Sequence, residues 1–206
     1  MRLPALVAAA VGASLAGLAG FAIPTVSAAP TPPAGVARST ATFHDDEIYG
    51  VSCIAGKGCL AVGKWFDSAK KTTRALAEYR TGATWVLNSA PTPTSSTVTA
   101  VQGVSCVSAT KSVCMAVGVT GTLTGTNNYA ALWNWSSWKL LTIPNAPSSL
   151  LNQINAVSCT SSSYCVATGH YVSTISHRGQ TDSLVWNGSS WSVKPVPQLA
   201  VKGISD

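Results

Sequence analysis

Charged side chains are scarce in this 206-residue chain: Asp, Glu, Lys and Arg make up 10% of it, and there are only three histidines. The sequence contains no G-x-S-x-G nucleophile elbow, no H-E-x-x-H pair and no P-loop. These absences leave no motif for acyl transfer, zinc-dependent proteolysis or nucleotide hydrolysis. We therefore predict no catalytic residue, no metal site and no cofactor.

A long uncharged run from Leu3 to Ala22 follows Arg2, and Pro24 comes soon after it. Small residues after Pro24 offer a cleavage site, so we predict a signal peptide over residues 1–28. The alternative, an uncleaved membrane anchor, stays open because the run is long enough to span a bilayer. Residues 29–42 are rich in Pro, Ala and Thr and are predicted to be a flexible leader. We expect a secreted or cell-surface protein that keeps no membrane contact after cleavage.

What the sequence does contain is a repeat. Two series of residues recur with a period of 53 residues. One is Cys53, Cys106 and Cys159, and the other is Trp85, Trp138 and Trp191. A fixed period of this size indicates a repeat architecture. We predict a propeller-like domain over residues 43–206, with repeats at about 43–95, 96–148 and 149–198. Residues 199–206 are predicted to begin a fourth unit, because Gly203-Ile204-Ser205 matches Gly50-Val51-Ser52.

The six cysteines form three close pairs. In an exported chain such pairs favour disulfides, and gaps of five and seven residues do not match the short spacings of zinc ligands. Each pair flanks a polar or Gly-rich turn between two short apolar runs, which predicts a hairpin bridged near its turn. The predicted bridges are Cys53–Cys59, Cys106–Cys114 and Cys159–Cys165. Each should contribute about 2.5 kcal/mol by closing a short loop.

Each repeat continues with a second hairpin, for which Asn187-Gly188 in the third repeat is the clearest turn signal. Prolines then mark the end of an outer strand. Four short strands per repeat predict an all-β fold with three four-stranded antiparallel blades of a β-propeller, as an arc or partial ring, each with one intra-blade disulfide. Variable loops between the second and third strands are predicted at residues 64–74, 119–128 and 170–182. Aromatic pairs predicted to flank the last turn and pack blade on blade are Tyr79/Trp85, Trp133/Trp138 and Trp186/Trp191.

Some of these motifs resemble known repeats. A glycine after the second strand, followed by aromatic residues and proline, resembles a kelch-type blade, although Gly63, Gly118 and Gly169 stand alone where kelch blades carry a Gly-Gly pair. The turn Gly82-x-x-Trp85 resembles the end of the Asp-box of sialidase-like propellers, without its acidic residue. More closely, Val-Ser-Cys…Cys-x-Ala-Val-Gly with Trp-Asn-Gly-Ser-Ser-Trp resembles a disulfide-bearing repeat of exported proteins from high-GC Gram-positive bacteria. That resemblance covers about residues 43–206. It implies a propeller and an exported location, and it implies no activity or site.

Three repeats are fewer than the four to eight blades that close a propeller ring. Three explanations stay open. The chain is a shortened copy of a longer array, two chains form a homodimer that completes a six-bladed ring, or three units close imperfectly into a smaller bundle.

Binding is the function that the sequence favours. Candidate ligand-binding residues are Trp85, Trp138 and Trp191, and Lys70, Lys71 and Arg74 from the basic cluster of the first repeat. The competing interpretations are blade packing for the tryptophans and a solvated surface for the cluster. We predict a non-catalytic binding or scaffold module for a glycan or an anionic cell-wall polymer, with no nucleic-acid partner. The alternative is a glycan hydrolase that uses loop carboxylates such as Glu78 and Asp182 in an assembled ring. The acidic segment His44 to Glu47 is interpreted as a solvated entry rather than a metal site.

Overall fold

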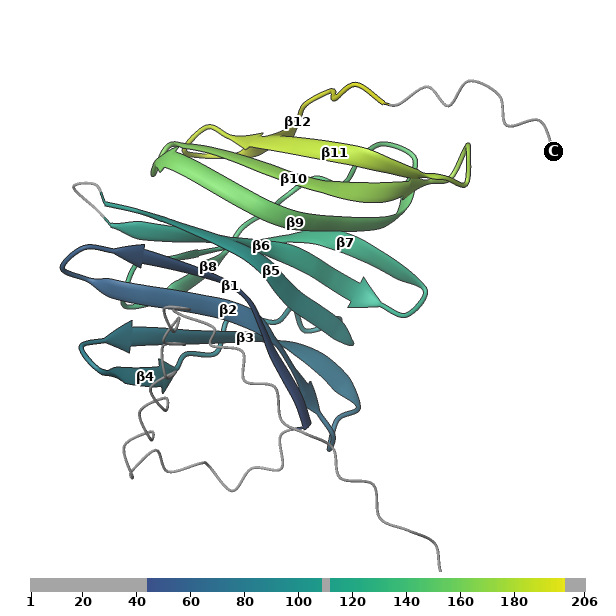
Figure 1. The fold of residues 1–206 in the computed structure, drawn as a ribbon. Coiled ribbons are helices and arrows are strands. Elements are labelled where there is room, and N and C mark those ends of the chain that lie inside the picture. Colours follow the sequence, from purple (N-terminus) through teal and green to yellow (C-terminus); the bar gives the residue numbers. More distant parts are fainter. Residues whose placement is uncertain (1–43, 109–111, 199–206) are drawn as a thin grey trace, which may run out of the picture. The chain divides into compact units, whose positions relative to one another are not determined.

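The computed structural model describes residues 44–108 and 112–198. These residues form twelve β-strands and no helix, so the all-β prediction is confirmed (Figure 1). In this part of the chain no helix is present that could cross a membrane. The predicted signal peptide, the leader and the start of a fourth unit at residues 199–206 lie outside the described residues.

The strands form three successive antiparallel meanders, one for each sequence repeat (Figure 1). The first repeat contains β1 (His44–Ile54), β2 (Gly58–Asp67), β3 (Thr72–Thr81) and β4 (Thr84–Leu87). The second contains β5 (Val98–Val107), β6 (Val113–Thr122), β7 (Gly125–Trp133) and β8 (Trp138–Leu140). The third contains β9 (Ser149–Ser161), β10 (Tyr164–Ser173), β11 (Gly179–Trp186) and β12 (Trp191–Val193). Single parallel bridges, Thr73 to Val98 and Thr126 to Leu151, connect one meander to the next, and the sheet does not close.

The predicted disulfides are all present. Cys53–Cys59, Cys106–Cys114 and Cys159–Cys165 join the first two strands of each repeat, and the paired cysteines face each other in the strand register. Their Cα atoms lie 4.0, 3.9 and 4.0 Å apart. Each bridge therefore clamps a hairpin within one repeat rather than joining two repeats.

The first strand of every repeat carries a β-bulge at the same place. In the first repeat Ile48 pairs with Gly63 and Gly50 with Val62, so Tyr49 is the extra residue. Gln102 and Asn155 hold the same position in the later repeats. The bulge brings the first strand onto the glycine opposite it. A Cβ atom at Gly63, Gly118 or Gly169 would lie 1.7, 2.0 or 2.0 Å from a backbone carbonyl oxygen of that strand. These glycines lie inside the second strands, not after them as predicted, and the approach of the first strand explains why each is a glycine.

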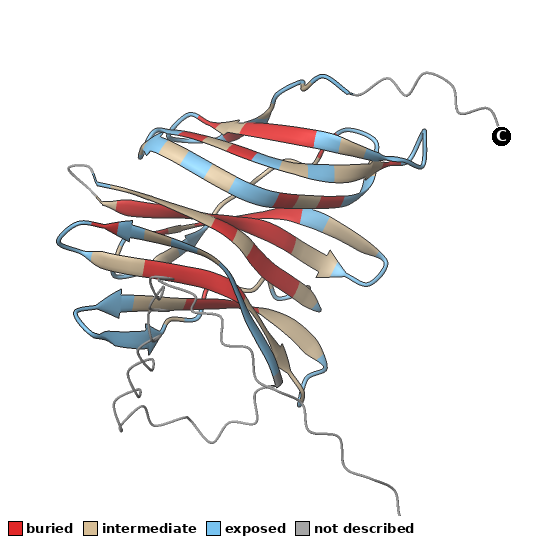
Figure 2. Ribbon diagram, in the orientation of Figure 1, coloured by how far each residue is buried: buried red, intermediate tan, exposed pale blue. Residues whose placement is uncertain are grey.

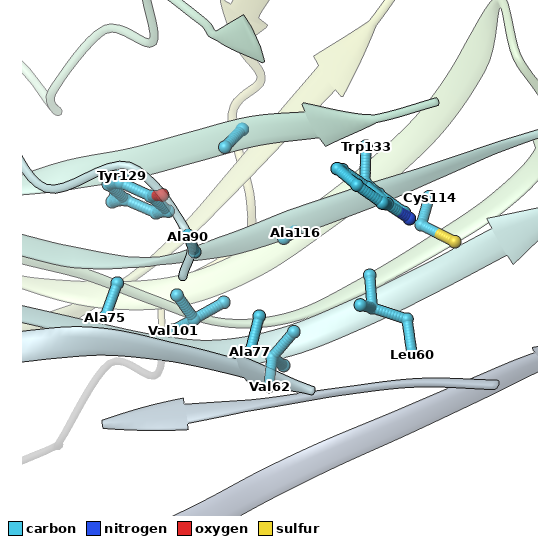
Figure 3. Close-up of a cluster of buried hydrophobic side chains, with 11 residues drawn as sticks. Leu60, Val62, Ala75, Ala77, Ala90, Val101, Cys114, Ala116, Tyr129 and Trp133 are labelled. Carbon is cyan, nitrogen blue, oxygen red and sulfur yellow. The ribbon is translucent and has the colours of Figure 1, made fainter. Parts of the chain in front are cut away.

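One hydrophobic core lies between the first and second repeats (Figures 2 and 3). Leu60 and Val62 of β2 meet Cys114 of β6 and Trp133 of β7, and Figure 3 shows Leu60 near Trp133 and Cys114. At the other end of the cluster, the Tyr129 hydroxyl donates a hydrogen bond to the carbonyl of Pro91 at 2.8 Å. The repeats are therefore held together by side chains that face outward from each meander.

A second core lies between the second and third repeats. Met115 and Val117 of β6 pack there with Ile154, Ala167 and Leu184 of the third repeat. Because successive side chains of a strand point to opposite faces, β6 supplies Cys114 and Ala116 to the first core and Met115 and Val117 to the second. In Figure 2, by contrast, most of β1 and all of β4 are exposed.

The predicted aromatic pairs occur in two of the three repeats. The ring centroids of Trp133 and Trp138 lie 5.3 Å apart, and those of Trp186 and Trp191 lie 5.8 Å apart, and both pairs pack between repeats. The predicted pair Tyr79/Trp85 is wrong. Arg80 lies opposite Trp85, whereas Tyr79 points to the other face and its ring centroid lies 6.4 Å from that of Trp133. A shift of one residue in register moves a side chain to the opposite face of the sheet.

The predicted variable loops are also mostly wrong. Residues 64–67 and 72–74 continue β2 and β3, and the later repeats behave in the same way. The turns that remain between the second and third strands are residues 68–71, 123–124 and 174–178. Polar and glycine residues in these segments produced the loop-like sequence pattern, but a strand ladder is held by backbone groups and so can continue through them, even where a polar side chain such as Asn128 is buried.

Candidate functional site

The basic cluster of the first repeat lies around the turn between β2 and β3. The Arg74 guanidinium is 3.6 Å from the Asp67 carboxylate and 5.7 Å from the centroid of the Trp65 ring. Asp67 also accepts the backbone N–H of Lys70 at 3.1 Å. Arg74 is therefore engaged in holding the turn, and Lys70 and Lys71 are the exposed charges of the predicted site.

A second polar cluster lies at the bulge of β1. Lys64 Nζ is 3.1 Å from Glu47 Oε1, and the Tyr49 hydroxyl donates to Glu47 Oε2. The hydrogen bond from Tyr49, followed by that from Lys64, lowers the pKa of the Glu47 carboxyl below its ordinary value. Glu47 is exposed and already satisfied, so we interpret the cluster as a brace for the bulge. Among the described residues, no three His, Cys, Asp or Glu side chains are grouped as metal ligands would be.

The three candidate tryptophans have different environments. Trp191 is buried and Trp138 is half-buried, and each packs in a core between repeats. Trp85 is 45% exposed on the face of the first repeat that points away from the second. Only Trp85 therefore presents a broad ring surface to solvent.

A groove crosses the junction of the second and third repeats, and we call it the interrepeat groove. Its volume is about 420 Å³. The lining residues are Lys139, Leu140, Leu141, Thr142, Pro144, Trp186, Ser189, Ser190 and Trp191. The lining combines apolar and aromatic side chains with hydroxyls and one ammonium group, and it includes no carboxylate. Of the predicted ligand-binding residues only Trp191 lines the groove.

The serine rim of this groove is preorganised by a turn. Asn187 Oδ1 accepts the backbone N–H groups of Ser189 at 3.0 Å and Ser190 at 2.8 Å, and it also accepts the Ser189 hydroxyl at 2.9 Å. This arrangement is an Asx-type turn, in which a short amide side chain replaces backbone partners. The sequence marked Asn187-Gly188 as a turn, but nothing in it placed that turn beside the end of β8, which comes from the previous repeat.

Another depression, of about 630 Å³, lies at the first disulfide hairpin. It is formed by residues 53–59 together with Thr81 and Gly82. Three of its nine lining residues are glycines, and Lys57 is its one charged side chain. It offers fewer side chains for specific recognition than the interrepeat groove.

The carboxylates of the hydrolase alternative are not brought together. Glu78 lies on β3 of the first repeat, opposite Leu87, and Asp182 lies on β11 between the second and third repeats. Asp182 is only 4% exposed, and its Oδ2 atom has no hydrogen-bond partner among the described residues. Burial raises the pKa of the Asp182 carboxyl, while hydrogen bonds from the Ser183 backbone and the Asn128 side chain partly lower it.

The buried acid makes a testable contribution to stability. Because its folded-state pKa is raised, the folded protein keeps a proton that the unfolded chain has lost, and stability falls as pH rises through that window. The Asp182→Asn variant should therefore have a higher Tm than the wild type at pH 7. The difference should vanish below the ordinary pKa of aspartate. Thermal melts from pH 3 to 8 measure this, with exposed Asp46→Asn as the control. A constant difference at every pH would contradict the assignment.

No protein-family model matches the chain, and no curated protein matches it. Among solved structures, it is similar to a fucose lectin from Kordia zhangzhouensis in complex with methyl-fucoside. The TM-score is 0.43 at 9% sequence identity, over 71% of this chain and 99% of that one. At this level the similarity assigns neither a fold family nor a ligand to the chain.

Proposed function

We propose that this chain is an exported, non-catalytic binding module whose three repeats are kelch-like blades of an open propeller arc, and that its ligand is a segment of glycan or anionic cell-wall polymer. The observation that carries the proposal is the composition of the interrepeat groove. Its apolar and aromatic side chains suit the faces of sugar rings, and its serine and threonine hydroxyls suit their polar edges.

Lys139 sets the expected preference of the groove. It is exposed on β8, and no acidic side chain lines the groove beside it. A ligand with negative charge is therefore favoured over a cationic one. The groove volume of about 420 Å³ lies within the range of small-ligand sites, so it matches a short segment of a polymer chain.

Export is supported by the three disulfides, which form in oxidising compartments. We do not propose glycan hydrolysis. Hydrolysis of this kind uses two carboxylates placed about 5–10 Å apart across the scissile bond, and the groove is lined by none.

Two variants test the groove directly. The mature protein is applied to an array of neutral and anionic glycans and titrated with isolated anionic cell-wall polymer. Lys139→Glu should weaken binding of the anionic ligand by about tenfold, because a favourable charge becomes a repulsive one. Ser189→Tyr should weaken every ligand by narrowing the rim. Both positions are exposed, so the fold should be retained.

Lys70→Glu is the matched control, since it makes the same charge change in the cluster of the first repeat. It should leave the affinity within about twofold at moderate salt, where distant surface charges are screened. An equal loss in Lys70→Glu and Lys139→Glu would overturn the groove as the site. Absence of binding to the array and to the polymer would overturn the binding function.

A further inference from the structure

One hydrogen bond is built twice between neighbouring repeats. The backbone N–H of Cys106 donates to Ser52 Oγ at 2.9 Å, and the N–H of Cys159 donates to Ser105 Oγ, also at 2.9 Å. In each case the serine lies on the first strand of one repeat, and the cysteine lies on the first strand of the next. In the Ser-Cys pair of each repeat, the serine Oγ is thus placed to accept from the following repeat, and the cysteine N–H is placed to donate to the preceding one.

At each end of the series, one group of this hydrogen bond has no equivalent partner among the described residues. Ser158 of the third repeat is the equivalent of Ser52 and Ser105, and Cys53 of the first repeat is the equivalent of Cys106 and Cys159. Within residues 44–108 and 112–198, no backbone N–H reaches Ser158 Oγ and no serine hydroxyl accepts from the Cys53 N–H. The acceptor at one end therefore matches the donor at the other.

The outer face of the first repeat carries exposed apolar side chains and two charged ones. We call it the N-terminal face, and its exposed apolar residues are Ile48 (47% exposed), Val51 (59%), Trp85 (45%) and Leu87 (59%). Glu78 and Arg80 belong to the same face, because they lie opposite Leu87 and Trp85 in the strand register. Ile48 holds the same register position as Val101 and Ile154. Each of the three lies opposite the glycine of the second strand of its own repeat, which is Gly63, Gly118 or Gly169. Val101 and Ile154 are completely buried against the preceding repeat. The N-terminal face thus matches a repeat interface on which, within residues 44–108 and 112–198, no other repeat packs.

The outer face of the third repeat is formed by the corresponding register positions, of which Ser183 is already buried. We call it the C-terminal face, and it comprises Ser158, Val166, Thr168, Ser183 and Val185. Its register positions match Ser52, Leu60, Val62, Ala77 and Tyr79 of the first repeat, which face the second repeat. Thr168 replaces a valine with a side chain of nearly the same volume, and Ser183 replaces an alanine. A hydroxyl on such a face tolerates water, as expected of a terminal repeat.

We propose that the C-terminal face of one chain docks on the N-terminal face of a second copy, in the manner of two consecutive repeats, with the Cys53 N–H of the second copy donating to Ser158 Oγ. The second copy is the occupant because the required surface already exists in the chain, and its packing and hydrogen bond are seen twice in the structure. Two such contacts related by a twofold axis would join six repeats in a closed ring. This assembly does not depend on what the groove binds.

The first test is the mass of the oxidised, exported protein by light scattering from about 1 to 100 µM. A mass of two chains is expected. Val51→Asp on the N-terminal face and Thr168→Asp on the C-terminal face should each weaken dimerisation by at least about 30-fold, because each buries a charge without a partner. Leu123→Asp is the control, since Leu123 is exposed in the β6–β7 turn and lies on neither face.

Mixing the two variants distinguishes this contact from any symmetric one. A Val51→Asp chain keeps an intact C-terminal face and a Thr168→Asp chain keeps an intact N-terminal face, so the mixture should recover a dimer through one contact. Unchanged far-UV spectra of both variants show that the fold is retained. A monomer at 100 µM overturns the proposal. So does a Thr168→Asp chain that still dimerises, or a mixture that stays monomeric.

Discussion

The Gly118→Ala variant is expected to lose about 3 kcal/mol of unfolding free energy, which corresponds to a fall in Tm of about 10 °C. The added Cβ would lie 2.0 Å from the carbonyl oxygen of Ala100 and 2.9 Å from the Cα of Val101. Both atoms belong to the backbone of β5, so no side-chain rotation can relieve the clash. β5 would have to move away from β6, and Val101, which is completely buried in the first core, would move with it.

The control for this effect is Gly179→Ala. Gly179 begins β11, and nothing lies within 4 Å of the position that its Cβ would occupy. Alanine there should leave the Tm within about 2 °C or raise it slightly, because it restricts the unfolded chain. Differential scanning calorimetry compares the two variants. A Gly118→Ala protein as stable as Gly179→Ala would show that the bulge does not bring β5 onto this glycine.

Removal of the second disulfide is expected to have the other large effect. The Cys106→Ala/Cys114→Ala variant loses about 2.6 kcal/mol of loop-closure entropy for the short loop between the two residues. It also loses the packing of the Cys114 sulfur, because Cys114 is completely buried between the first and second repeats. The total should be about 3–4 kcal/mol, measured by urea unfolding under non-reducing conditions.

Cys53→Ala/Cys59→Ala separates the two causes. Its loop is of similar length, so its closure entropy is nearly the same, but Cys53 is exposed and Cys59 is half-buried on the outer face of the first repeat. This variant should lose about 2.4 kcal/mol and little more. Equal losses in the two double variants would mean that the Cys114 sulfur contributes nothing to the core between repeats.

Much of the local structure could be predicted because its causes are local. The period of Cys53, Cys106 and Cys159 located each hairpin, and the short spacing within each pair located the disulfide that clamps it. The aromatic pairs were predicted correctly in the second and third repeats, because Trp133 and Trp186 lie directly opposite Trp138 and Trp191. In the first repeat the aromatic Tyr79 lies one position earlier, and strand parity placed it on the other face.

Other features depend on what lies beside a residue in space. The bulge opposite Gly63, Gly118 and Gly169 was missed, since the sequence shows a glycine but not the backbone that approaches it. The interrepeat groove was missed because its rim comes from the third repeat and Lys139 from the second. Asp182 was considered as a catalytic acid, but its location between repeats gives it a buried, structural environment.

The sequence by itself determined the all-β character, the three repeats and the pairing of the six cysteines, because alternation, turn chemistry and short loops act over a few residues. Only the tertiary structure decided which face of each strand meets the neighbouring repeat, where the groove lies, and which apolar side chains on the first repeat are exposed. Those outcomes depend on register and on contacts between segments about 50 residues apart, such as the hydrogen bond from Cys106 to Ser52.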